Sequence, residues 1–367
     1  MIRVLHVINN ADLGGISTML LNYYKNINRD EIHFDFIYSV DEPLGYNGNK
    51  LKKLGAEFYY VPRKSLDLKS HVKGIRDVVN NGNYDAIHVH SNHTSYVALA
   101  VAKKCGIKIR VAHAHNAVKG WLGIKESVSR LVGILLINYY STKCLACSED
   151  AATYTFGSKS LKRNKTMIIH NAIDCKAFGF SETNRSAIRM EYGIGNEILV
   201  FGTVARMSYE KNIIYLLEVL KEIQKRTRAL LFLIGDGDER SKIEAKAYEL
   251  NISQSVIFAG KHSDVYRYLS AFDVFVIPSL NEGFSIAGLE AGANGLPIVM
   301  SEAVPLELSF LPNTTYLPLE GEEKKWADTI IACKRLRMKK SVLEVEQNGY
   351  DIRKTVKILE KVYIGEI

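Results

Sequence analysis

The most informative part of this chain is Val274-Phe-Val-Ile-Pro-Ser-Leu-Asn-Glu282-Gly-Phe-Ser-Ile-Ala-Gly-Leu-Glu290. Its first four residues form an apolar run that is typical of a buried parallel strand. A helix of small residues follows, and Gly295 and Pro297 close it. A strand, a short turn and a helix in this order indicate an α/β fold.

Two acids in this stretch lie where one ligand could contact both. Glu282 is expected at the carboxyl end of the strand, and Glu290 lies eight positions further on. Eight positions at about 100° per residue return to nearly the same helix face. The amides of Gly283, Phe284 and Ser285 would lie at the helix start, where N–H groups and the helix dipole favour an anion. Carboxylates for hydroxyls beside amides for phosphate predict a sugar-nucleotide site. In the alternative interpretation, Glu282 caps the helix and Glu290 is a solvated acid.

Short apolar runs separated by helical patterns recur along the whole chain. Such alternation predicts parallel sheets with helices on both faces. We predict two doubly wound, Rossmann-like domains that face each other across a cleft, over 1–175 and 176–349, and an amphipathic helix in 350–367 that packs back onto the first. The polar stretch 174–196 is the predicted hinge. The runs are 4–8, 34–38, 58–61, 86–90, the neighbours of Val111, 167–169, 198–202, 230–235, 256–259, 274–277 and 297–300.

Composition narrows the class of protein. The chain has 367 residues with 47% hydrophobic content, enough for two cores of ordinary size. It has no apolar stretch of about 18 residues, and its amino terminus enters a strand directly, which argues against a spanning helix and a secretory signal. Five cysteines without a framework spacing indicate a reducing compartment, so we expect a cytoplasmic protein. We interpret the C-x-x-C of Cys144 and Cys147 as core thiols.

The excess positive charge is confined to the first half. Residues 1–175 carry 23 Lys and Arg against 14 Asp and Glu, a net charge of +9, whereas the remainder carries 25 against 26, a net charge of −1. The basic residues are densest over 50–76. An anionic membrane, a lipid-linked phosphate or nucleic acid could use such a surface, and an ordinary solvated face is the alternative. No nucleic-acid motif accompanies it, so a membrane or lipid phosphate is preferred.

The first turn after a predicted strand carries paired glycines, Gly14 and Gly15. Glycines there let backbone amides approach a phosphate or sugar without an intervening Cβ. The sequence is not G-x-G-x-x-G, and no acid lies clearly at the end of the second strand to bind a ribose. Both observations disfavour a dinucleotide site. An ordinary tight turn is the alternative.

Histidines gather after two predicted strands. Alternate histidines on a strand share one side and could hold zinc. No Cys or carboxylate beside them completes a tetrahedral set, so we predict no metal site and prefer a polar wall facing a sugar, with core histidines as the alternative. Asp236-Gly-Asp238 is likewise interpreted as a helix N-cap and not as a metal ligand set. The histidines are His88, His90, His93, His113 and His115.

The turn after the first strand of the second half holds Arg206 and Lys211. Arg206 offers a bidentate fork and Lys211 a mobile point charge, which together could neutralise a diphosphate without a metal ion. The alternative is an exposed basic turn.

These features together resemble a known family, the retaining glycosyltransferases of the GT-B fold, family four. The likeness rests on Arg206 with Lys211, on Glu-Gly-Phe-Ser with a second glutamate eight positions after the first, on Gly-Leu-Pro-Ile-Val and on the glycine pair. Within that family, His113-Ala-His-Asn116 and Asn171-Ala-Ile-Asp174 resemble bacterial capsular and exopolysaccharide transferases.

The resemblance implies a role for each site residue. Arg206 and Lys211 would bind the diphosphate of a nucleotide sugar, most often UDP-linked, and stabilise the leaving charge. Glu290 would hold the ribose hydroxyls and Glu282 the hydroxyls of the transferred sugar, with His115 against the sugar ring and His113 as its alternative. Gly14 and Gly15 would meet the phosphate from the first domain, opposite the amides of Gly283, Phe284 and Ser285.

The resemblance also implies transfer with retention, no side-chain nucleophile, and no cofactor or metal. The acceptor would be a saccharide or a lipid-linked oligosaccharide, reached peripherally at the inner face of the plasma membrane. Two other classes stay open: a binding protein that kept the fold and lost turnover, and an NAD-dependent oxidoreductase that binds nicotinamide nucleotide at the Gly14-Gly15 loop.

Overall fold

The computed structural model describes residues 1–12, 15–41, 43–115, 123–161, 165–282, 284–334, 336–339 and 341–367. It divides the chain into two compact units, Met1–Ala172 with Asp351–Ile367, and Ile173–Tyr350. We call them the N-terminal unit and the C-terminal unit. The sequence placed the division after residue 175, and the structure places it after Ala172.

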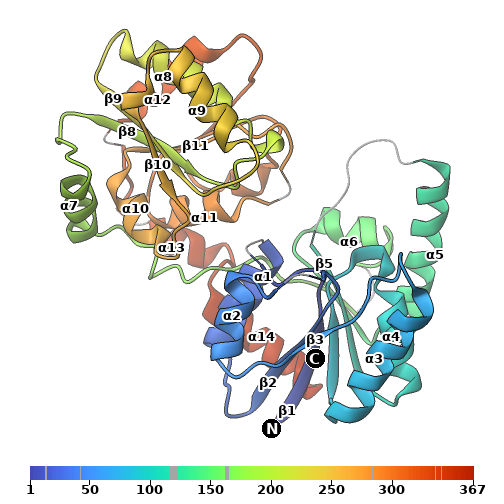
Figure 1. The fold of residues 1–367 in the computed structure, drawn as a ribbon. Helices are drawn as coiled ribbons and strands as arrows, with labels where there is room; N and C mark the ends of the chain where they lie inside the picture. Colours follow the sequence, from blue (N-terminus) through green and yellow to red (C-terminus); the bar gives the residue numbers. More distant parts are fainter. Residues whose placement is uncertain are drawn as a thin grey trace. The chain divides into compact units, whose positions relative to one another are not determined.

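The N-terminal unit is built on a seven-stranded parallel sheet in the order β3-β2-β1-β4-β5-β6-β7. Its strands are β1 Ile2–Val7, β2 Ile32–Tyr38, β3 Phe58–Tyr60, β4 Ala86–Val89, β5 Ile109–Ala114, β6 Lys143–Ala146 and β7 Thr166–Ile168. Its helices are α1 Gly15–Asn26, α2 Tyr46–Lys53, α3 Leu68–Gly82, α4 Tyr96–Lys104, α5 Ile124–Tyr140, α6 Glu149–Phe156 and α14 Ile352–Ile364, with the 3-10 turn η1 at Asn92–Thr94. Figure 1 shows this sheet between α1, α2 and α14 on one side and α3 and α4 on the other.

Alternate residues along each strand of this sheet supply two cores. Val4 and Phe34 point into a core with α1, α2 and α14, whereas the neighbouring Leu5 and Ile37 point into a core with α3, α4, α5 and α6. This two-residue period is the geometry of a strand buried on both faces. The last helix, α14, belongs to the first of these cores, so the end of the chain completes the N-terminal unit.

The C-terminal unit has a six-stranded parallel sheet in the order β10-β9-β8-β11-β12-β13. Its strands are β8 Leu199–Val204, β9 Ala229–Ile234, β10 Val256–Gly260, β11 Val274–Ile277, β12 Ile298–Ser301 and β13 Thr314–Leu317. Its α-helices are α7 Glu182–Glu191, α8 Ile213–Gln224, α9 Arg240–Glu249, α10 Val265–Ala271, α11 Ile286–Ala293, α12 Glu323–Cys333 and α13 Ser341–Gln347. Its 3-10 turns are η2 Tyr209–Lys211, η3 Ser253–Ser255 and η4 Leu306–Leu308.

The predicted fold class, two Rossmann-like parallel-sheet domains, is confirmed. Two strands were not predicted, β6 and β13. Cys144 and Cys147 are buried, as predicted for core thiols, but Cys144 lies within strand β6. No helix among the described residues combines the length and apolarity needed to cross a membrane.

The predicted hinge over 174–196 is wrong in extent, because most of that stretch is packed structure. It contains α7, whose polar face carries Arg185 and Arg189. Both guanidinium groups bind Asp273, at 2.7 Å and 2.8 Å, and Arg189 and Asp273 are largely buried. A polar sequence therefore became core structure because its charges pair with a buried acid, which hydrophobic patterning does not reveal.

Removing this acid should destabilise the C-terminal unit. Asp273→Asn leaves two guanidinium groups against a buried amide, and unpaired buried charges cost about 3–5 kcal/mol of unfolding free energy. We expect a lower midpoint in thermal unfolding. The matched control is Asp328→Asn, which breaks an exposed pair with Arg226 and should cost less than about 1 kcal/mol. Equal effects of the two variants would contradict this account.

Candidate functional site

The candidate site of the C-terminal unit lies where β8 and β11 end. The loops after these strands are joined by a hydrogen bond from the Leu280 amide to the Glu210 carbonyl, 2.8 Å long. Lys211 in η2 donates from Nζ to Glu282 Oε2 at 2.5 Å, and the Ser279 hydroxyl donates to the same oxygen at 3.1 Å. The structure thus brings together a cation and an acid that lie 71 positions apart in the sequence.

The second predicted cation, Arg206, points elsewhere. Its Nη2 binds Asp238 Oδ2 at 2.8 Å, and both side chains are exposed. The interpretation of Asp236 and Asp238 as an N-cap is wrong, because the N-cap residue of α9 is Glu239 and no side chain caps that helix. The loop after β9 holds Asp238 beside Arg206.

Gly235 allows the loop after β9 to lie close to the turn that carries Arg206. Gly235 has φ of +132°, and a Cβ there would lie 1.9 Å from the Ala205 carbonyl oxygen. Any other residue would push the loop away from the Arg206 turn.

The start of α11 offers free backbone donors. Ser285 is the N-cap residue, and its hydroxyl accepts a hydrogen bond from the Gly288 amide at 3.1 Å. Glu282 is therefore not the cap. No described residue accepts a hydrogen bond from the amides of Phe284 and Ser285. Gly283, the third predicted donor, lies outside the described residues.

An aromatic stack fixes the turn that carries these amides. The Phe284 ring lies 5.4 Å from the Tyr350 ring at an interplanar angle of 14°. On its other side Tyr350 stacks on Phe310, also at 5.4 Å. The ring of Phe284 therefore packs against Tyr350 and holds the turn that carries its amide.

Glu290 is a half-buried acid on α11. Within the described part of the chain, no hydrogen bond or ion pair reaches its carboxylate. Burial raises the pKa of Glu290 to about 8, because the charged form loses solvation without gaining a partner. A carboxyl group in this state fits a ligand that supplies hydroxyl donors. The alternative of a solvated surface acid does not describe it.

The glycine turn of the N-terminal unit lies at the start of α1. Gly15 is the first residue of the helix, and a Cβ added there would meet no atom of the described residues within 4 Å. The space in front of Gly15 is therefore open for a ligand. Gly14 lies outside the described residues.

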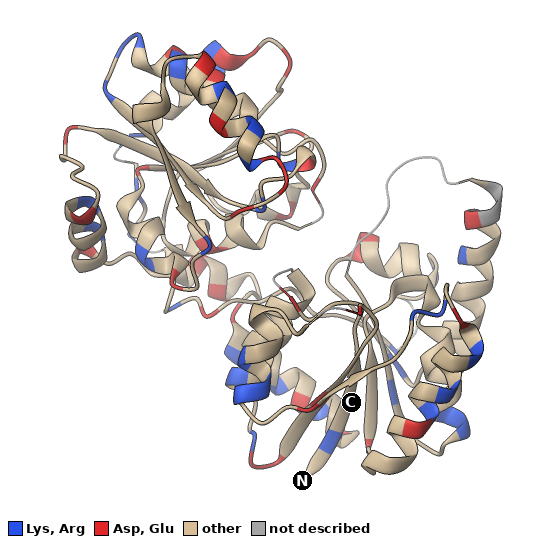
Figure 2. Cartoon of the chain, in the orientation of Figure 1, with Lys and Arg blue, Asp and Glu red and all other residues tan. Residues whose placement is uncertain are grey.

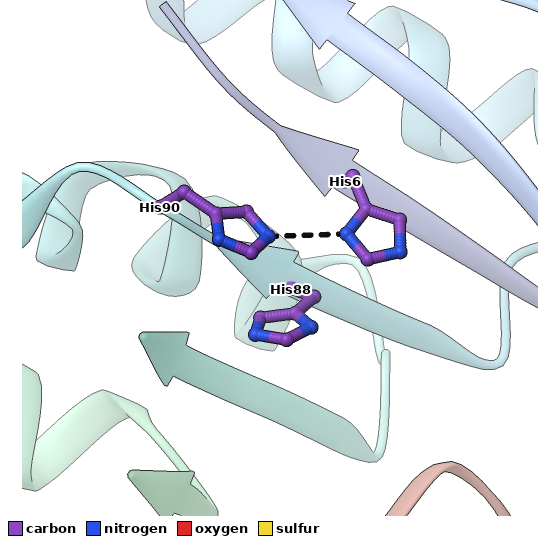
Figure 3. Close-up of side chains that lie close together, drawn as sticks. All are labelled: His6, His88 and His90. Atoms are coloured by element: carbon purple, nitrogen blue, oxygen red, sulfur yellow. Dashed lines mark hydrogen bonds between the residues drawn. The ribbon is translucent and has the colours of Figure 1, made fainter. Parts of the chain in front are cut away.

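The histidines form hydrogen-bonded chains on one face of the sheet. His6 Nδ1 lies 3.1 Å from His90 Nε2, and His90 Nδ1 lies 2.7 Å from His115 Nε2. Figure 3 shows the first of these bonds, which joins β1 to the residue after β4. His6 was not predicted, because it lies within a strand that patterning assigns to the core.

A second chain begins on the last helix. The Tyr363 hydroxyl lies 2.6 Å from His88 Nδ1, and His88 Nε2 lies 3.1 Å from His113 Nδ1. His113 is fully buried, whereas His115 is partly exposed at the end of its strand. Of the two candidates for contact with a sugar, His115 is thus the accessible one.

Burial keeps all five of these histidines neutral. It lowers the pKa of His6 and of His115 to about 3, because charged imidazolium is poorly solvated there. It lowers the pKa values of His88, His90 and His113 well below the ordinary value for the same reason.

Among the residues that the structure describes, two groups of three histidines could geometrically hold a metal ion. They are His6, His88 and His90, and His90, His113 and His115, with ring nitrogens within 4.8 Å of one another in each group. His93, predicted with the others, lies in η1 and belongs to neither group. The rings of His88 and His90 are stacked at 4.3 Å and 28°, and stacked rings do not point their in-plane lone pairs at one ion. The first group therefore suits a hydrogen-bonded chain better than a coordinated cation, and in the second group a hydrogen bond already joins His90 to His115.

The buried histidines should make the N-terminal unit sensitive to acid. The unfolded chain, with histidine pKa values near ~6.5, binds more protons than the folded one below that pH. Stability is therefore complete above about pH 7 and falls as the pH drops, by up to about 1.4 kcal/mol per pH unit for each histidine.

We expect His88→Gln/His113→Gln to weaken this dependence. The measurement is the thermal unfolding midpoint between about pH 7.5 and about pH 5.5, where unfolded-state histidines titrate. His262→Gln, a substitution of a partly exposed histidine of the C-terminal unit, should retain the wild-type slope. A double variant with an unchanged slope would refute the assignment.

Comparisons with known proteins agree with this geometry. The model of group 1 glycosyl transferases matches residues 184–341, and the model of glycosyltransferase family 4 matches residues 13–177. The chain is 32% identical to a Bacillus subtilis strain 168 protein, EpsF, whose name carries a provisional assignment as a glycosyltransferase, over 98% of this chain and 96% of the relative. It is 23% identical, over 82% of this chain and 79% of the relative, to the Escherichia coli UDP-Gal:alpha-D-GlcNAc-diphosphoundecaprenol alpha-1,3-galactosyltransferase.

A solved structure shows the same fold. The crystal structure of Anabaena HepE in complex with UDP is similar with a TM-score of 0.73 at 19% identity, over 98% of this chain and 95% of that one. The two family models together match parts of both units, and one relative matches along nearly its whole length. The chain therefore belongs to glycosyltransferase family 4 and has the GT-B fold.

Proposed function

We propose that this protein transfers a sugar from a UDP-linked donor to a saccharide or lipid-linked saccharide, with retention of anomeric configuration. The observation that carries the proposal is the Lys211–Glu282 ion pair, which Phe284 and Ser285 follow closely in the sequence. No described residue accepts a hydrogen bond from the amides of Phe284 and Ser285. Diphosphate and sugar hydroxyls need this combination of charges and donors. UDP is preferred because HepE was crystallised with UDP, and the Escherichia coli relative is named for UDP-Gal and a diphosphoundecaprenol acceptor.

The ion pairs of the free protein suggest how the donor is received. The Arg206–Asp238 pair is exposed on both sides, and such pairs contribute only about 0–1 kcal/mol. Arg206 can therefore leave Asp238 for a diphosphate at little cost. Lys211 is held at the site by Glu282 and is already in place when charge develops on the leaving phosphate.

The remaining site residues are proposed to orient the donor. Glu282 accepts hydrogen bonds from the transferred sugar, Glu290 from the ribose, and the helix start of α11 binds the phosphate. His115 contacts the sugar ring, and the turn with Gly14 and Gly15 approaches the phosphate. Retention without a protein nucleophile then requires only that the acceptor attacks from the face that the diphosphate leaves. We propose that neither a metal ion nor a cofactor takes part.

The setting proposed for the reaction is capsular or exopolysaccharide synthesis at the cytoplasmic face of the membrane. The sequence resembles enzymes of that kind, and the basic N-terminal unit suits an anionic surface or a lipid diphosphate. Family membership disfavours the nicotinamide-dependent oxidoreductase. The remaining alternative is a member of the family without turnover.

Turnover should depend on Lys211. In Lys211→Ala, the rate of nucleotide release from the preferred donor of a UDP-, GDP- and ADP-sugar panel should fall by about 10² or more, because leaving-group stabilisation is lost. Lys225→Ala, which breaks an exposed pair with Glu222, is the matched control and should be unaffected. Wild-type turnover should persist in EDTA. Full turnover in Lys211→Ala, or none in the wild type with any donor, would overturn the proposal.

Nucleotide binding should be linked to the proton on Glu290. If ribose hydroxyls donate to this carboxylate, binding favours its ionised form, so below about pH 8 each binding event releases a proton. Affinity should then rise with pH, by up to about tenfold per unit, and level off above pH 8.

Calorimetry with UDP in buffers of different ionisation enthalpy measures this release. UDP itself titrates, so the informative quantity is the difference between the wild type and Glu290→Gln. Glu320→Gln, a glutamate substitution outside the site, should match the wild type. Identical proton release in wild type and Glu290→Gln would exclude Glu290 from ribose binding.

A further inference from the structure

Helix α5 exposes an uninterrupted apolar face. Its members recur at intervals of three and four positions over about three turns, so they form one stripe along the helix. Their exposed fractions are far above those of core residues. We call this set the α5 stripe: Val128 at 55%, Leu131 at 59%, Val132 at 45%, Leu135 at 71% and Tyr139 at 66%.

The opposite face of the same helix is fixed in the core. Ile137 is fully buried, and Asn138 donates to the carbonyl of Phe156 on α6 at 3.0 Å. A Cβ at Gly133 would lie 2.4 Å from the His93 carbonyl oxygen, so the helix packs closely on η1. Because α5 cannot rotate to bury the stripe without losing these contacts, the stripe is a surface feature. Exposed apolar surface of this extent indicates an interaction site.

Lysines border the carboxyl end of the stripe. Lys103 Nζ lies 4.0 Å from the centre of the Tyr139 ring, and the adjacent Lys104 is exposed. Arg110 binds the Tyr140 carbonyl at 2.7 Å and the Lys108 carbonyl at 3.0 Å, which places the exposed Lys108 at the same end. The apolar face therefore adjoins positive charge.

The unit that carries the α5 stripe is also the positively charged one. The N-terminal unit holds 27 Lys and Arg against 16 Asp and Glu, a net charge of +11. The C-terminal unit holds 21 against 24, a net charge of −3. Lys and Arg lie on several helices of the N-terminal unit (Figure 2).

The charge and the size of the stripe indicate which kind of partner binds it. If a second copy of the chain bound through this face, two N-terminal units with a net charge of +11 each would repel one another. Five side chains are also far fewer than the roughly 20–30 residues that each partner contributes to a stable protein interface. An anionic lipid surface meets both conditions, because it attracts lysine and accepts a single helix face at the boundary of headgroups and acyl chains.

We propose that the N-terminal unit docks on anionic membrane through the α5 stripe, with Lys103, Lys104 and Lys108 on lipid phosphates. The proposal deepens the proposed function, since it assigns the membrane contact to α5. The basic stretch over 50–76, to which the sequence points, offers two strongly exposed leucines, Leu66 and Leu68, but no stripe of comparable length.

Vesicle sedimentation of the full-length protein tests the proposal. The wild type should bind vesicles that contain phosphatidylglycerol and should bind phosphatidylcholine alone at least about tenfold more weakly. Leu131→Asp/Leu135→Asp should reduce binding to the anionic vesicles at least about tenfold, because charge cannot enter the acyl boundary. Lys103→Ala/Lys104→Ala should reduce it by about fivefold per lysine at low salt.

Matched controls test the location. Met190→Asp/Leu343→Asp places the same charges on exposed apolar positions of α7 and α13, and should bind as the wild type does. In Leu135→Trp, vesicles should shift the fluorescence of the new indole to shorter wavelength, and lipids brominated near the headgroup should quench it. Both readouts are independent of turnover.

Three results would overturn the proposal. They are unchanged vesicle binding by Leu131→Asp/Leu135→Asp, loss of binding only on charge reversal of Lys52 and Lys53, and a dimer in sedimentation velocity that the aspartates dissociate. UDP binding by the same variants is measured separately. If UDP binds but vesicles do not, the docking proposal fails alone; if vesicles bind but no sugar nucleotide does, the proposed function fails alone.

Discussion

A parallel sheet brings the carboxyl ends of all its strands to one edge, and every candidate site residue in this chain depends on that constraint. Lys211 follows β8 and Glu282 follows β11, and their side chains meet because those strands are neighbours. His90 and His115 are brought together in the same way by β4 and β5. The order of the strands therefore brings the site residues of each unit to one edge, where α1 and α11 also begin.

Charge is handled differently in each part of the molecule. Asp273 is paired within the core and stabilises the fold, whereas Glu290 is desolvated without a partner and keeps its proton near neutral pH. Glu282 is intermediate between Asp273 and Glu290: it is paired with Lys211 in the free protein, but a bound diphosphate would compete with it for that lysine. An acid that is costly to ionise in the free protein gains most from a ligand that donates hydrogen bonds to it.

The sequence predicted the fold class and the edge on which the candidate site lies, because strands buried on both faces and helix-start residues leave local patterns. It could not predict that Arg206 pairs with Asp238, or that His6 joins the histidine chains, since both contacts depend on strand order. The predicted hinge was wrong over α7, because few apolar residues anchor that helix and its ion pairs to Asp273 leave no hydrophobic pattern. The exposure of the α5 stripe could not be predicted, because an apolar helix face has the same sequence pattern whether it is buried or exposed.

A crystal structure with a non-hydrolysable UDP-sugar would show whether Lys211 and the two glutamates hold a sugar nucleotide. We expect Lys211 Nζ within about 3 Å of a phosphate oxygen, Glu290 accepting from both ribose hydroxyls, and Arg206 released from Asp238. A ligand bound elsewhere, with the Lys211–Glu282 and Arg206–Asp238 pairs unchanged, would contradict this expectation.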